Sequence, residues 1–523
     1  MRRRCDVTGD GLEEMKPRAP DTTTGLEGLP VPEKDLIERA RTIHEGWRAE
    51  AGESKRLGLT LEDYEQQGKY IYYFKNGSPI APKKVFSSPI ISEVPEINLY
   101  VHIPFCTGRC TFCCCYSVGR RPESTVDAYV HSLKKELDLL VATSRFDHSA
   151  IRYIYFGGGT PTCLSAGQLD DLIGSLRRRL NVLPEANFTC EASPETIVGS
   201  AGKEKLEALV KNGTTRLSIG VQSFDDGILM RIGRSHGSET AMAAYENASA
   251  AGFRNLNVDL MFGLPGQTLD TWERDLQIVT TLRPGWVSLY RLRTEENPRI
   301  YEAYARARGL FPDKETTLLM NIMAVEKAAD SGYTPANAPH TFVLQSRLDY
   351  VSRHVLAEEE LGIGASARSY LDGVRYYNIH DLKKYRLAID KGRLPISFAG
   401  KYSKRQQVER AAVLMLRSSK GVARVDFKTA FGIDFEKLFG EPLRKLKGAG
   451  MITDDGETFR LSHKGVVFAA EAFRQLYSID PVDRLRDAVF NNRFLKRLFL
   501  RTRFSKPVEA MATVVKTWVG SSE

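Results

Sequence analysis

The sequence predicts an α/β fold: an incomplete (β/α)6 barrel with an N-terminal extension and a smaller, mostly helical C-terminal domain. Six short runs rich in β-branched and aromatic residues recur along the middle of the chain, and segments with helical periodicity separate them. Alternating strands and helices form a parallel sheet with right-handed crossovers, and six units fall short of the eight of a closed barrel. With 523 residues, the chain is also long enough for more than one domain.

The predicted elements follow one another in a regular order. The six strands are 99–103, 151–157, 187–192, 215–221, 255–263 and 286–292. The helices between them are 126–141, 165–180, 203–212, 238–251 and 269–282. In folds of this kind ligands bind at the C-terminal ends of the strands, so we expect the functional residues there.

The remaining segments differ in composition from the predicted barrel. The predicted organisation is an N-terminal extension at 1–90 with one helix near 32–51, a partial barrel at 91–300, a barrel-completing or linker region of helix and loop at 301–377, a smaller helical domain at 378–480 with a hairpin near 451–461, and a basic amphipathic tail at 481–523. No chemistry is evident in the extension.

Composition and charge exclude few classes of function. The formal net charge is +9 and the isoelectric point is near 9.0, which would suit nucleic acid, an anionic lipid surface or an acidic partner. No apolar run approaches the ~18 residues of a membrane-spanning helix, and Asp6 and Asp10 fall where a signal peptide needs an apolar stretch. We therefore expect a cytoplasmic protein without a membrane span. An amphipathic basic tail docks more often on a surface or a partner than on nucleic acid, which disfavours nucleic-acid binding.

Five of the eight cysteines fall between Cys106 and Cys115. A disulfide framework would scatter them through a small secreted chain, so metal binding is the better interpretation. Cys106, Cys110 and Cys113 follow the first predicted strand at spacings of four and three, which places three thiolates on one loop. Three thiolates suit an iron–sulfur cluster and leave one iron of a cubane open. A zinc site with Cys115 as the fourth ligand is the alternative, and the role of Cys114 stays open.

Polar and glycine residues mark the ends of the other predicted strands. The stretch GGGT at 157–160 follows the second strand, where glycine lets backbone groups approach a ligand closely and the threonine adds a hydroxyl. Glu191, Gln222 and Asp259 lie at or near the ends of the third, fourth and fifth strands, and Arg234 follows in the next helix. Each of them alone is more often structural, but together they indicate one site at one end of the sheet.

The cysteine motif after YVHIPF resembles the signature of radical S-adenosylmethionine (SAM) enzymes, and the stretch from about 98 to 477 is similar to the branch that contains the oxygen-independent coproporphyrinogen III oxidases. The resemblance implies a [4Fe–4S] cluster on Cys106, Cys110 and Cys113, whose open iron binds SAM and cleaves it to a 5′-deoxyadenosyl radical. It implies a small-molecule substrate, a flavodoxin- or ferredoxin-like electron donor, and His102 as a proton donor. It also implies two SAM molecules, bound by residues that match Tyr100, Phe112, Gly158, Gly159, Thr160, Glu191, Gln222, Arg234 and Asp259.

Three departures from the oxidases bear on the reaction. The Arg-Tyr-Thr-Ser-Tyr-Pro segment before the first strand is missing, since 83–94 reads KKVFSSPIISEV. Cys114-Cys115-Tyr116 replaces Gly-Cys-Asn, and Arg293 stands where the oxidases carry a small residue lining the second SAM site. Arg293 therefore indicates either an altered second site or a carboxylate partner.

Radical C-methyltransferases and cyclopropanases of natural-product pathways share this scaffold and use two SAM molecules. Because the porphyrin-associated segment is missing while the cofactor residues are kept, the sequence favours their reaction, the addition of a methyl or methylene group to an sp² carbon. Oxidative decarboxylation of coproporphyrinogen, or the heme binding of other relatives, is the alternative.

Overall fold

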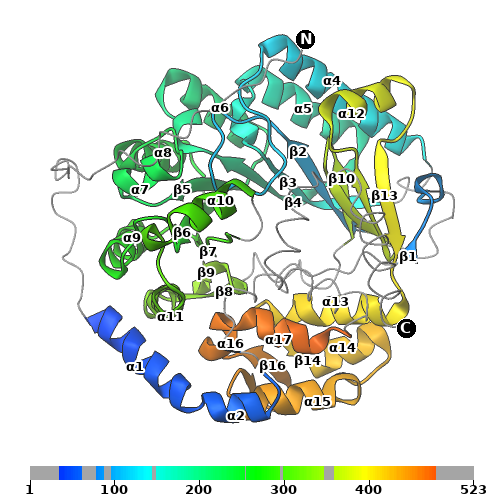
Figure 1. Cartoon of the computed structure of the whole chain (residues 1–523). Coiled ribbons are helices and arrows are strands. Elements are labelled where there is room, and N and C mark those ends of the chain that lie inside the picture. Colours follow the sequence, from blue (N-terminus) through cyan, green and yellow to red (C-terminus); the bar gives the residue numbers. More distant parts are fainter. Residues whose placement is uncertain are drawn as a thin grey trace, which may run out of the picture.

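The computed structural model describes residues 35–59, 61, 78–86, 96–143, 149–253, 255–294, 298–346 and 359–478 (Figure 1). The tail predicted at 481–523 and much of the predicted N-terminal extension lie outside these residues. The helix expected near 32–51 is present as α1 (Asp35–Ala49), and α2 (Ala51–Arg56) follows it. Among the described residues, no helix is both long and apolar enough to cross a bilayer.

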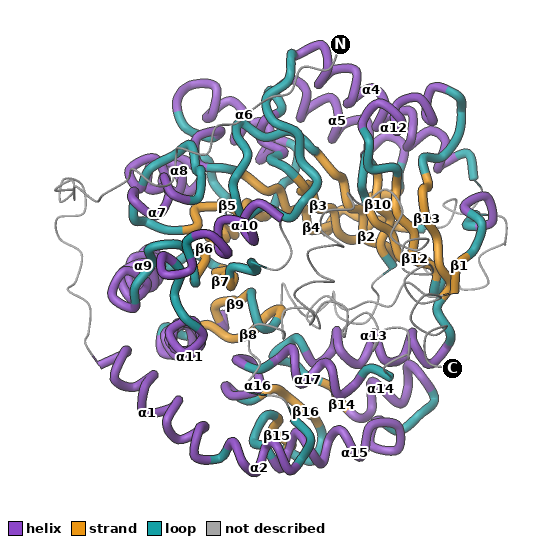
Figure 2. Tube along the Cα trace, in the orientation of Figure 1, coloured by secondary structure: helices purple, strands orange, loops and turns teal. Residues whose placement is uncertain are grey.

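All six predicted strands are present, side by side and in chain order, at the centre of one sheet (Figures 1 and 2). They are β2 (Glu96–Ile103), β3 (Ala150–Gly158), β4 (Asn181–Ala192), β5 (Arg216–Gln222), β6 (Asn255–Phe262) and β7 (Trp286–Arg291). Each pairs with the next in parallel orientation. The parallel order confirms the predicted architecture.

The helices that connect these strands begin and end close to the predicted limits. They are α4 (Glu123–Val141), α5 (Ala166–Arg179), α6 (Gly199–Lys211), α8 (Ser238–Ala250) and α9 (Leu269–Leu282), with a short α7 (Asp226–Arg231) before α8. Ser165 and Thr268 cap α5 and α9, because each side chain accepts a hydrogen bond from the backbone N–H three residues on. Leu137 and Leu172 belong to the apolar faces that α4 and α5 pack against the sheet.

The sheet is wider than the sequence predicts. Within the described residues it has 13 strands in the order β1-β13-β12-β11-β10-β2-β3-β4-β5-β6-β7-β9-β8. The additional strands are β1 (Ser78–Pro79), β8 (Tyr333–Asn337), β9 (Thr341–Leu344), β10 (Glu360–Ile363), β11 (Arg368–Leu371), β12 (Val374–Asn378) and β13 (Ile396–Lys401). β10 runs parallel to β2, whereas the strands outside β10 and β7 are antiparallel. β1 and β8 end the sheet without pairing to each other, so the barrel is incomplete, as predicted.

Strands β8 to β12 correct the expectation of helix and loop at 301–377. The α-helices in the described part of this region are α10 (Pro298–Arg306) and α11 (Lys314–Asp330). Each missed strand has only four or five residues, too few to show a period of two, and glycine or proline interrupts two of them. The domain limits stay predictions. The sequence places the start of the helical domain at 378. Because β13 pairs with β12 in the main sheet, the structure supports a start after Lys401.

The C-terminal helices form a second group below the sheet in Figure 2. The elements are α13 (Lys404–Leu416), β14 (Val422–Ala423), α14 (Arg424–Phe431), α15 (Phe435–Gly448), β15 (Ile452–Asp454), β16 (Thr458–Leu461), α16 (His463–Val467) and α17 (Ala469–Leu476). β15 and β16 pair antiparallel, which confirms the hairpin predicted near 451–461. Phe427, Phe435 and Phe439 are buried together, with the Phe435 ring centroid 4.9 and 5.0 Å from the other two.

Helix α1 joins this group to the main sheet. Arg39 forms an ion pair with Glu326 on α11, at 3.9 Å. About two helical turns after Arg39, the Trp47 ring of α1 lies 5.6 Å from the ring of Phe468, the residue between α16 and α17. The predicted N-terminal helix therefore packs across both parts of the chain (Figure 1).

One face of the parallel strands is apolar and the other is polar. Leu99, Ile154 and Val258 belong to the main core. The residues that alternate with them form the second face, which we call the inner face. Its members in cross-strand pairs are Tyr100 with Tyr155, Glu191 with Ser218, and Asp259 with Gly220 and Ser288. Parallel strands that are buried on both sides are usually apolar on both, so a polar inner face indicates a ligand site.

A buried carboxyl on α4 holds the loop after β10 in place. Glu136 is 1% exposed and accepts hydrogen bonds from the Gly364 backbone N–H (2.7 Å), Asn378 Nδ2 (2.6 Å) and Tyr385 Oη (2.6 Å). Tyr385 lies on α12 (Leu382–Asp390). Burial raises the pKa of Glu136 to about 7, against the lowering effect of these three donors.

We predict that Glu136 makes the free energy of unfolding depend on pH. The unfolded carboxyl titrates near 4.5 and the folded one near 7, so its stabilising contribution is complete below the first value and is lost as the pH rises to the second. In Glu136→Gln this part of the pH dependence disappears, and the amide N–H₂ faces donors, at a cost of about 1–3 kcal/mol. Urea unfolding of both proteins across this pH window measures both effects. An identical pH slope in the two proteins would contradict the prediction.

Candidate functional site

The loop that follows β2 carries the cysteine motif and is tied down along its length. The Cys106 N–H donates to the Val118 carbonyl (3.0 Å), and the Val118 N–H donates to the Pro104 carbonyl (2.6 Å). Between these points, the Thr111 N–H donates to the carbonyl of Ile232, which follows α7 (3.1 Å). The sheet and α7 therefore position the loop at its ends and in its middle.

The three predicted cluster ligands on this loop are partly exposed cysteines, and none of them forms a disulfide. Nowhere in the described ranges do three His, Cys, Asp or Glu side chains converge as ligands of a single ion. A cubane does not require such convergence, because each cysteine binds a different iron. Tetrahedral zinc does require it. The positions of Cys106, Cys110 and Cys113 on one loop are therefore compatible with a cubane.

Arg234 lies against this loop from the segment after α7. Its Nη1 donates to Cys110 Sγ (3.3 Å), and its Nη2 donates to Ser193 Oγ (2.9 Å) and to the Gly220 carbonyl (2.5 Å). The remaining donor, Nε, is buried and has no hydrogen-bond partner among the described residues. A guanidinium beside a sulfur ligand stabilises negative charge on it, and the unpartnered Nε suits a further acceptor. Both features fit an anionic cluster ligated by cysteine.

The glycine turn after β3 packs directly against the cysteine loop. The Gly159 N–H donates to the Ile103 carbonyl (2.8 Å), and the Thr160 N–H donates to the Phe105 carbonyl (2.7 Å). Thr160 Oγ1 also donates to Cys106 Sγ (3.8 Å). A Cβ on Gly159 would lie 3.0 Å from the same sulfur. Glycine is therefore needed here for the approach of two backbone segments to each other.

His102 lies beneath this turn and is only 4% exposed. Its Nε2–H donates to the Tyr116 carbonyl (2.9 Å), so Nδ1 is the acceptor for Tyr100 Oη (2.8 Å). Burial lowers the pKa of His102 to about 4, which keeps the imidazole neutral. The single N–H of the neutral imidazole is thus donated to the Tyr116 carbonyl. The role of His102 as a proton donor stays a prediction.

Two of the predicted SAM residues are partly buried carboxyls on the inner face. Glu191 accepts from Tyr155 Oη (2.5 Å) and from the Gly158 N–H (3.2 Å), and burial raises its pKa to about 7. Asp259 accepts from Ser218 Oγ (3.0 Å) and Asn257 Nδ2 (2.7 Å), and burial raises its pKa as well. Both groups would bind a cationic ligand, because a positive charge offsets the cost of ionising a buried carboxyl.

The last two predicted residues lie at the edges of this group. Gln222 ends β5 with φ 77°, a conformation that costs a residue with a side chain about 1–2 kcal/mol. Backbone strain of this kind often marks a functional position. Phe112 packs instead into a small apolar cluster with Ile228 and Ile232. The structure therefore brings the cysteine loop together with Tyr100, His102, Gly158, Gly159, Thr160, Glu191 and Arg234, and it places Phe112 on the side toward α7.

Sequence reasoning missed Tyr155 as an inner-face residue, and it missed that arginine charges act on Cys114. Tyr155 pairs with Tyr100 on the inner face, and the alternation of IRYIYFG was the signal that could have identified it. Cys114 and Cys115 are exposed. The hydrogen bond with Cys115 lowers the pKa of Cys114 to about 6, and the charges of Arg293 and Arg368 act in the same direction.

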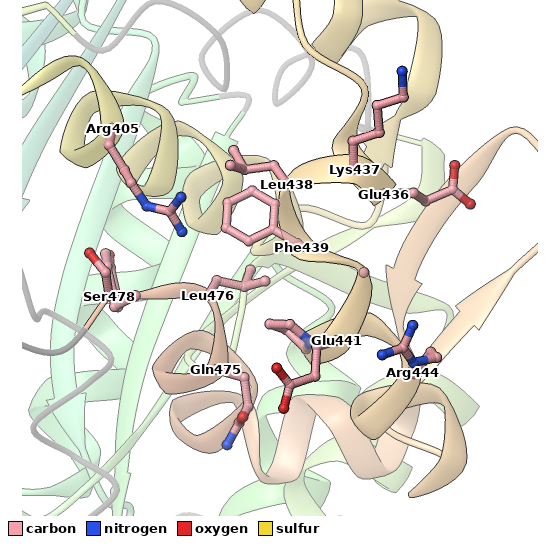
Figure 3. A pocket seen from close by; sticks show the side chains of 13 residues that line it. Arg405, Glu436, Lys437, Leu438, Phe439, Glu441, Arg444, Gln475, Leu476 and Ser478 are labelled. Atoms are coloured by element: carbon pink, nitrogen blue, oxygen red, sulfur yellow. The ribbon is translucent and has the colours of Figure 1, made fainter.

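A large hollow in the C-terminal domain is not part of this group. It has a volume of about 540 Å³ and lies between α13, α15 and α17 (Figure 3). Arg405, Phe439 and Gln475 are among its lining residues, and none of the predicted site residues is. The strand ends of the sheet therefore remain the candidate site.

We predict that Gly158→Ala disrupts the turn. Gly158 has φ +113°, and an added Cβ would lie 2.5 Å from Cε1 of the buried His102 ring. The strained backbone and the displaced ring should lower the free energy of unfolding by about 1–3 kcal/mol. In the matched control Gly119→Ala, no heavy atom lies within 4 Å of the new methyl group. Chemical denaturation measures both variants, and equal stabilities would contradict the packing described.

Comparison with known proteins agrees with this geometry. Residues 100–279 match the radical SAM superfamily, and residues 402–468 match the HemN C-terminal domain. The heme chaperone HemW of Bacillus subtilis is 31% identical over 386 residues, which cover 72% of this chain and 98% of HemW. The oxygen-independent coproporphyrinogen III oxidase of Pseudomonas aeruginosa is 28% identical over 387 residues, 71% of this chain and 83% of the oxidase.

Among solved structures, coproporphyrinogen III oxidase (HemN) of Escherichia coli superposes with a TM-score of 0.67 at 23% identity, over 77% of this chain and 96% of the other. The fold is therefore that of HemN, an incomplete barrel with a C-terminal helical domain. The cysteine loop, the superfamily match and the near-complete coverage of HemW place this chain in the radical SAM superfamily, in the family of the heme chaperone HemW and the oxygen-independent coproporphyrinogen III oxidases.

Proposed function

We propose that Cys106, Cys110 and Cys113 hold the [4Fe–4S] cluster that membership of the superfamily implies, and that SAM binds at its open iron. When bound, the cluster supplies the electron that cleaves SAM. The observation that carries this proposal is the contact of Arg234 with Cys110 Sγ, together with the pairing of the cysteine loop with the glycine turn. These contacts fix the thiols before any ligand binds.

The chain's own residues orient the cofactor and balance its charge. Arg234 neutralises part of the negative charge that three thiolates bring. Glu191 and Asp259 face the same end of the sheet, where they would accept hydrogen bonds from an ammonium group or a ribose. A cationic ligand there would favour their ionised forms and lower their raised pKa values. The other SAM residues predicted from the sequence, a second SAM molecule, and His102 as a proton donor remain parts of this proposal.

The substrate that we propose is a tetrapyrrole with carboxylate groups, and the reaction is its oxidative decarboxylation. The relatives described above are named for heme and for coproporphyrinogen. None of the three is named as a methyltransferase, so the methyl or methylene transfer that the sequence favoured has no support from them. An electron donor of the flavodoxin or ferredoxin type would supply the electron that cleaves SAM. At each propionate chain the 5′-deoxyadenosyl radical would take one hydrogen atom, and an external one-electron acceptor would take the second electron as carbon dioxide leaves.

Heme binding without turnover is the second candidate, and one observation favours it. The chain covers 98% of B. subtilis HemW, against 83% of the P. aeruginosa oxidase. Heme iron needs an axial ligand such as histidine. The exposed His380 lies beside the cysteine loop, with its ring centroid 3.9 Å from that of Tyr116, and would be a candidate ligand.

We predict that Cys106→Ala, Cys110→Ala and Cys113→Ala each lose the cluster. With one thiolate removed, iron and sulfide content after anaerobic reconstitution should fall severalfold, and 5′-deoxyadenosine formation should stop. Cys114→Ala and Cys115→Ala are the matched controls from the same loop, and they should keep wild-type iron content. Loss of iron in Cys115→Ala would point to a site with four cysteines and contradict the assignment.

A labelling experiment tests the reaction. The reduced protein is given SAM labelled at the methyl group together with coproporphyrinogen III. Release of carbon dioxide without label in the product is the expected result. Label in the product would establish methyl or methylene transfer instead. A stable Soret band with added heme, lost in His380→Ala and without carbon dioxide release, would establish the second candidate.

A further inference from the structure

An exposed arginine lies in the middle of the sheet at the cysteine end. Arg368 begins β11 and is exposed, although strands lie on both sides of it. Next to it on β10 is Gly362, which pairs with Tyr100 on β2. A Cβ on Gly362 would collide with the Arg368 carbonyl oxygen, so glycine at this position lets β11 approach β10 closely and places Arg368 two strands from Tyr100. Consistent with this placement, the charges of Arg368 and Tyr100 influence each other, and so do those of Arg368 and Cys115.

Within the described part of the chain, no hydrogen bond or ion pair of the Arg368 guanidinium is present, and Glu360 is the carboxylate whose charge acts on it most. Glu360 starts β10, whereas the cysteine loop lies beyond the C-terminal ends of the strands. An arginine without a partner on a polar inner face is therefore open to an anionic ligand at that end.

A second arginine approaches the same place from the opposite side of the parallel array. Arg293 follows β7 by two residues, and β7 and β10 are the outermost parallel strands. The charges of both Arg293 and Arg368 act on the thiol of Cys114, which is exposed and is not one of the proposed cluster ligands. Both arginines therefore lie at the C-terminal ends of the parallel array, the end that also carries the cysteine loop.

We infer that Arg293 and Arg368 form a carboxylate-binding pair for the substrate, beside Cys114 and Cys115. This inference rests on the proposed function, because it assigns the site of the substrate's carboxylates. A guanidinium binds a carboxylate through two parallel hydrogen bonds, which fixes orientation as well as affinity. The ring of Tyr100, on the strand next to Gly362, would contact the flat body of a macrocycle.

The methionine carboxylate of a second SAM molecule carries the same chemistry, so the test separates the two sources. Equilibrium binding to the reconstituted protein is measured with three probes: coproporphyrin III, its tetramethyl ester and SAM. The variants are Arg293→Met and Arg368→Met, with Arg293→Lys and Arg368→Lys to keep the charge without the two-pronged geometry. Arg444→Met is the matched control, since Arg444 lies at the hollow of the C-terminal domain (Figure 3). Iron content checks that each variant is folded and loaded.

The expected result is a rise of about tenfold or more in the Kd for coproporphyrin III in each Met variant, and a smaller rise in each Lys variant. The ester, which lacks the charges, should bind equally to wild type and variants, and Arg444→Met should match wild type throughout. Unchanged coproporphyrin binding in the variants, or a rise confined to SAM, would overturn the inference and leave the proposed function in place. If wild type binds no coproporphyrin III, the proposed substrate and the inference both fail.

Discussion

The site depends on how closely the turn after β3 approaches the loop after β2. A Cβ added to Gly158 would collide with the His102 ring. A Cβ added to Gly159 would collide with the backbone of the cysteine loop and lie close to Cys106 Sγ. Because neither glycine carries a side chain, two backbone hydrogen bonds can join the turn to β2 and its loop. That pairing fixes Cys106, and the contact of Arg234 fixes Cys110 from the other side. Cys106 and Cys110 are thus held by contacts with other parts of the fold, whereas Cys113 Sγ lies 4.0 Å from the Cys115 carbonyl oxygen of its own loop.

The polar inner face is the second constraint. Burying Glu191 and Asp259 raises their pKa values, which means that folding alone works against their ionised forms. Hydrogen bonds from Tyr155, Ser218 and Asn257 offset part of that cost. A fold selected for stability alone would place apolar residues here, as it does on the outer face. The arrangement is typical of a surface that awaits a ligand carrying positive charge.

Much of the fold could be predicted because its signals are local. Runs such as 151–157 are long enough to show strand composition, and the helices between them show their period. Strands such as β10 and β11 have four residues each, and only their neighbours in the sheet make them strands. Their position follows from tertiary pairing, which periodicity does not contain.

The same difference applies to the candidate site. The cysteine motif and the glycine turn are contiguous in sequence and could be identified there. Arg368 could not, since its place beside Tyr100 depends on β10 lying between them with glycine at 362. Phe112 stays a predicted SAM residue, and what the motif does not contain is that its ring packs toward α7. The preference for methyl transfer rested on a missing segment and on the retained cofactor residues, and the names of the relatives give it no support.

The central claim is that three protein thiolates leave one iron of a cubane without a protein ligand. Mössbauer spectroscopy of protein reconstituted with iron-57, recorded with and without SAM, tests it most directly. One iron of the four should change its coordination when SAM is added, while the other three should not. A Mössbauer spectrum in which none of the four irons changes on addition of SAM, or a tetrahedral zinc ion in place of the cluster, would contradict the claim.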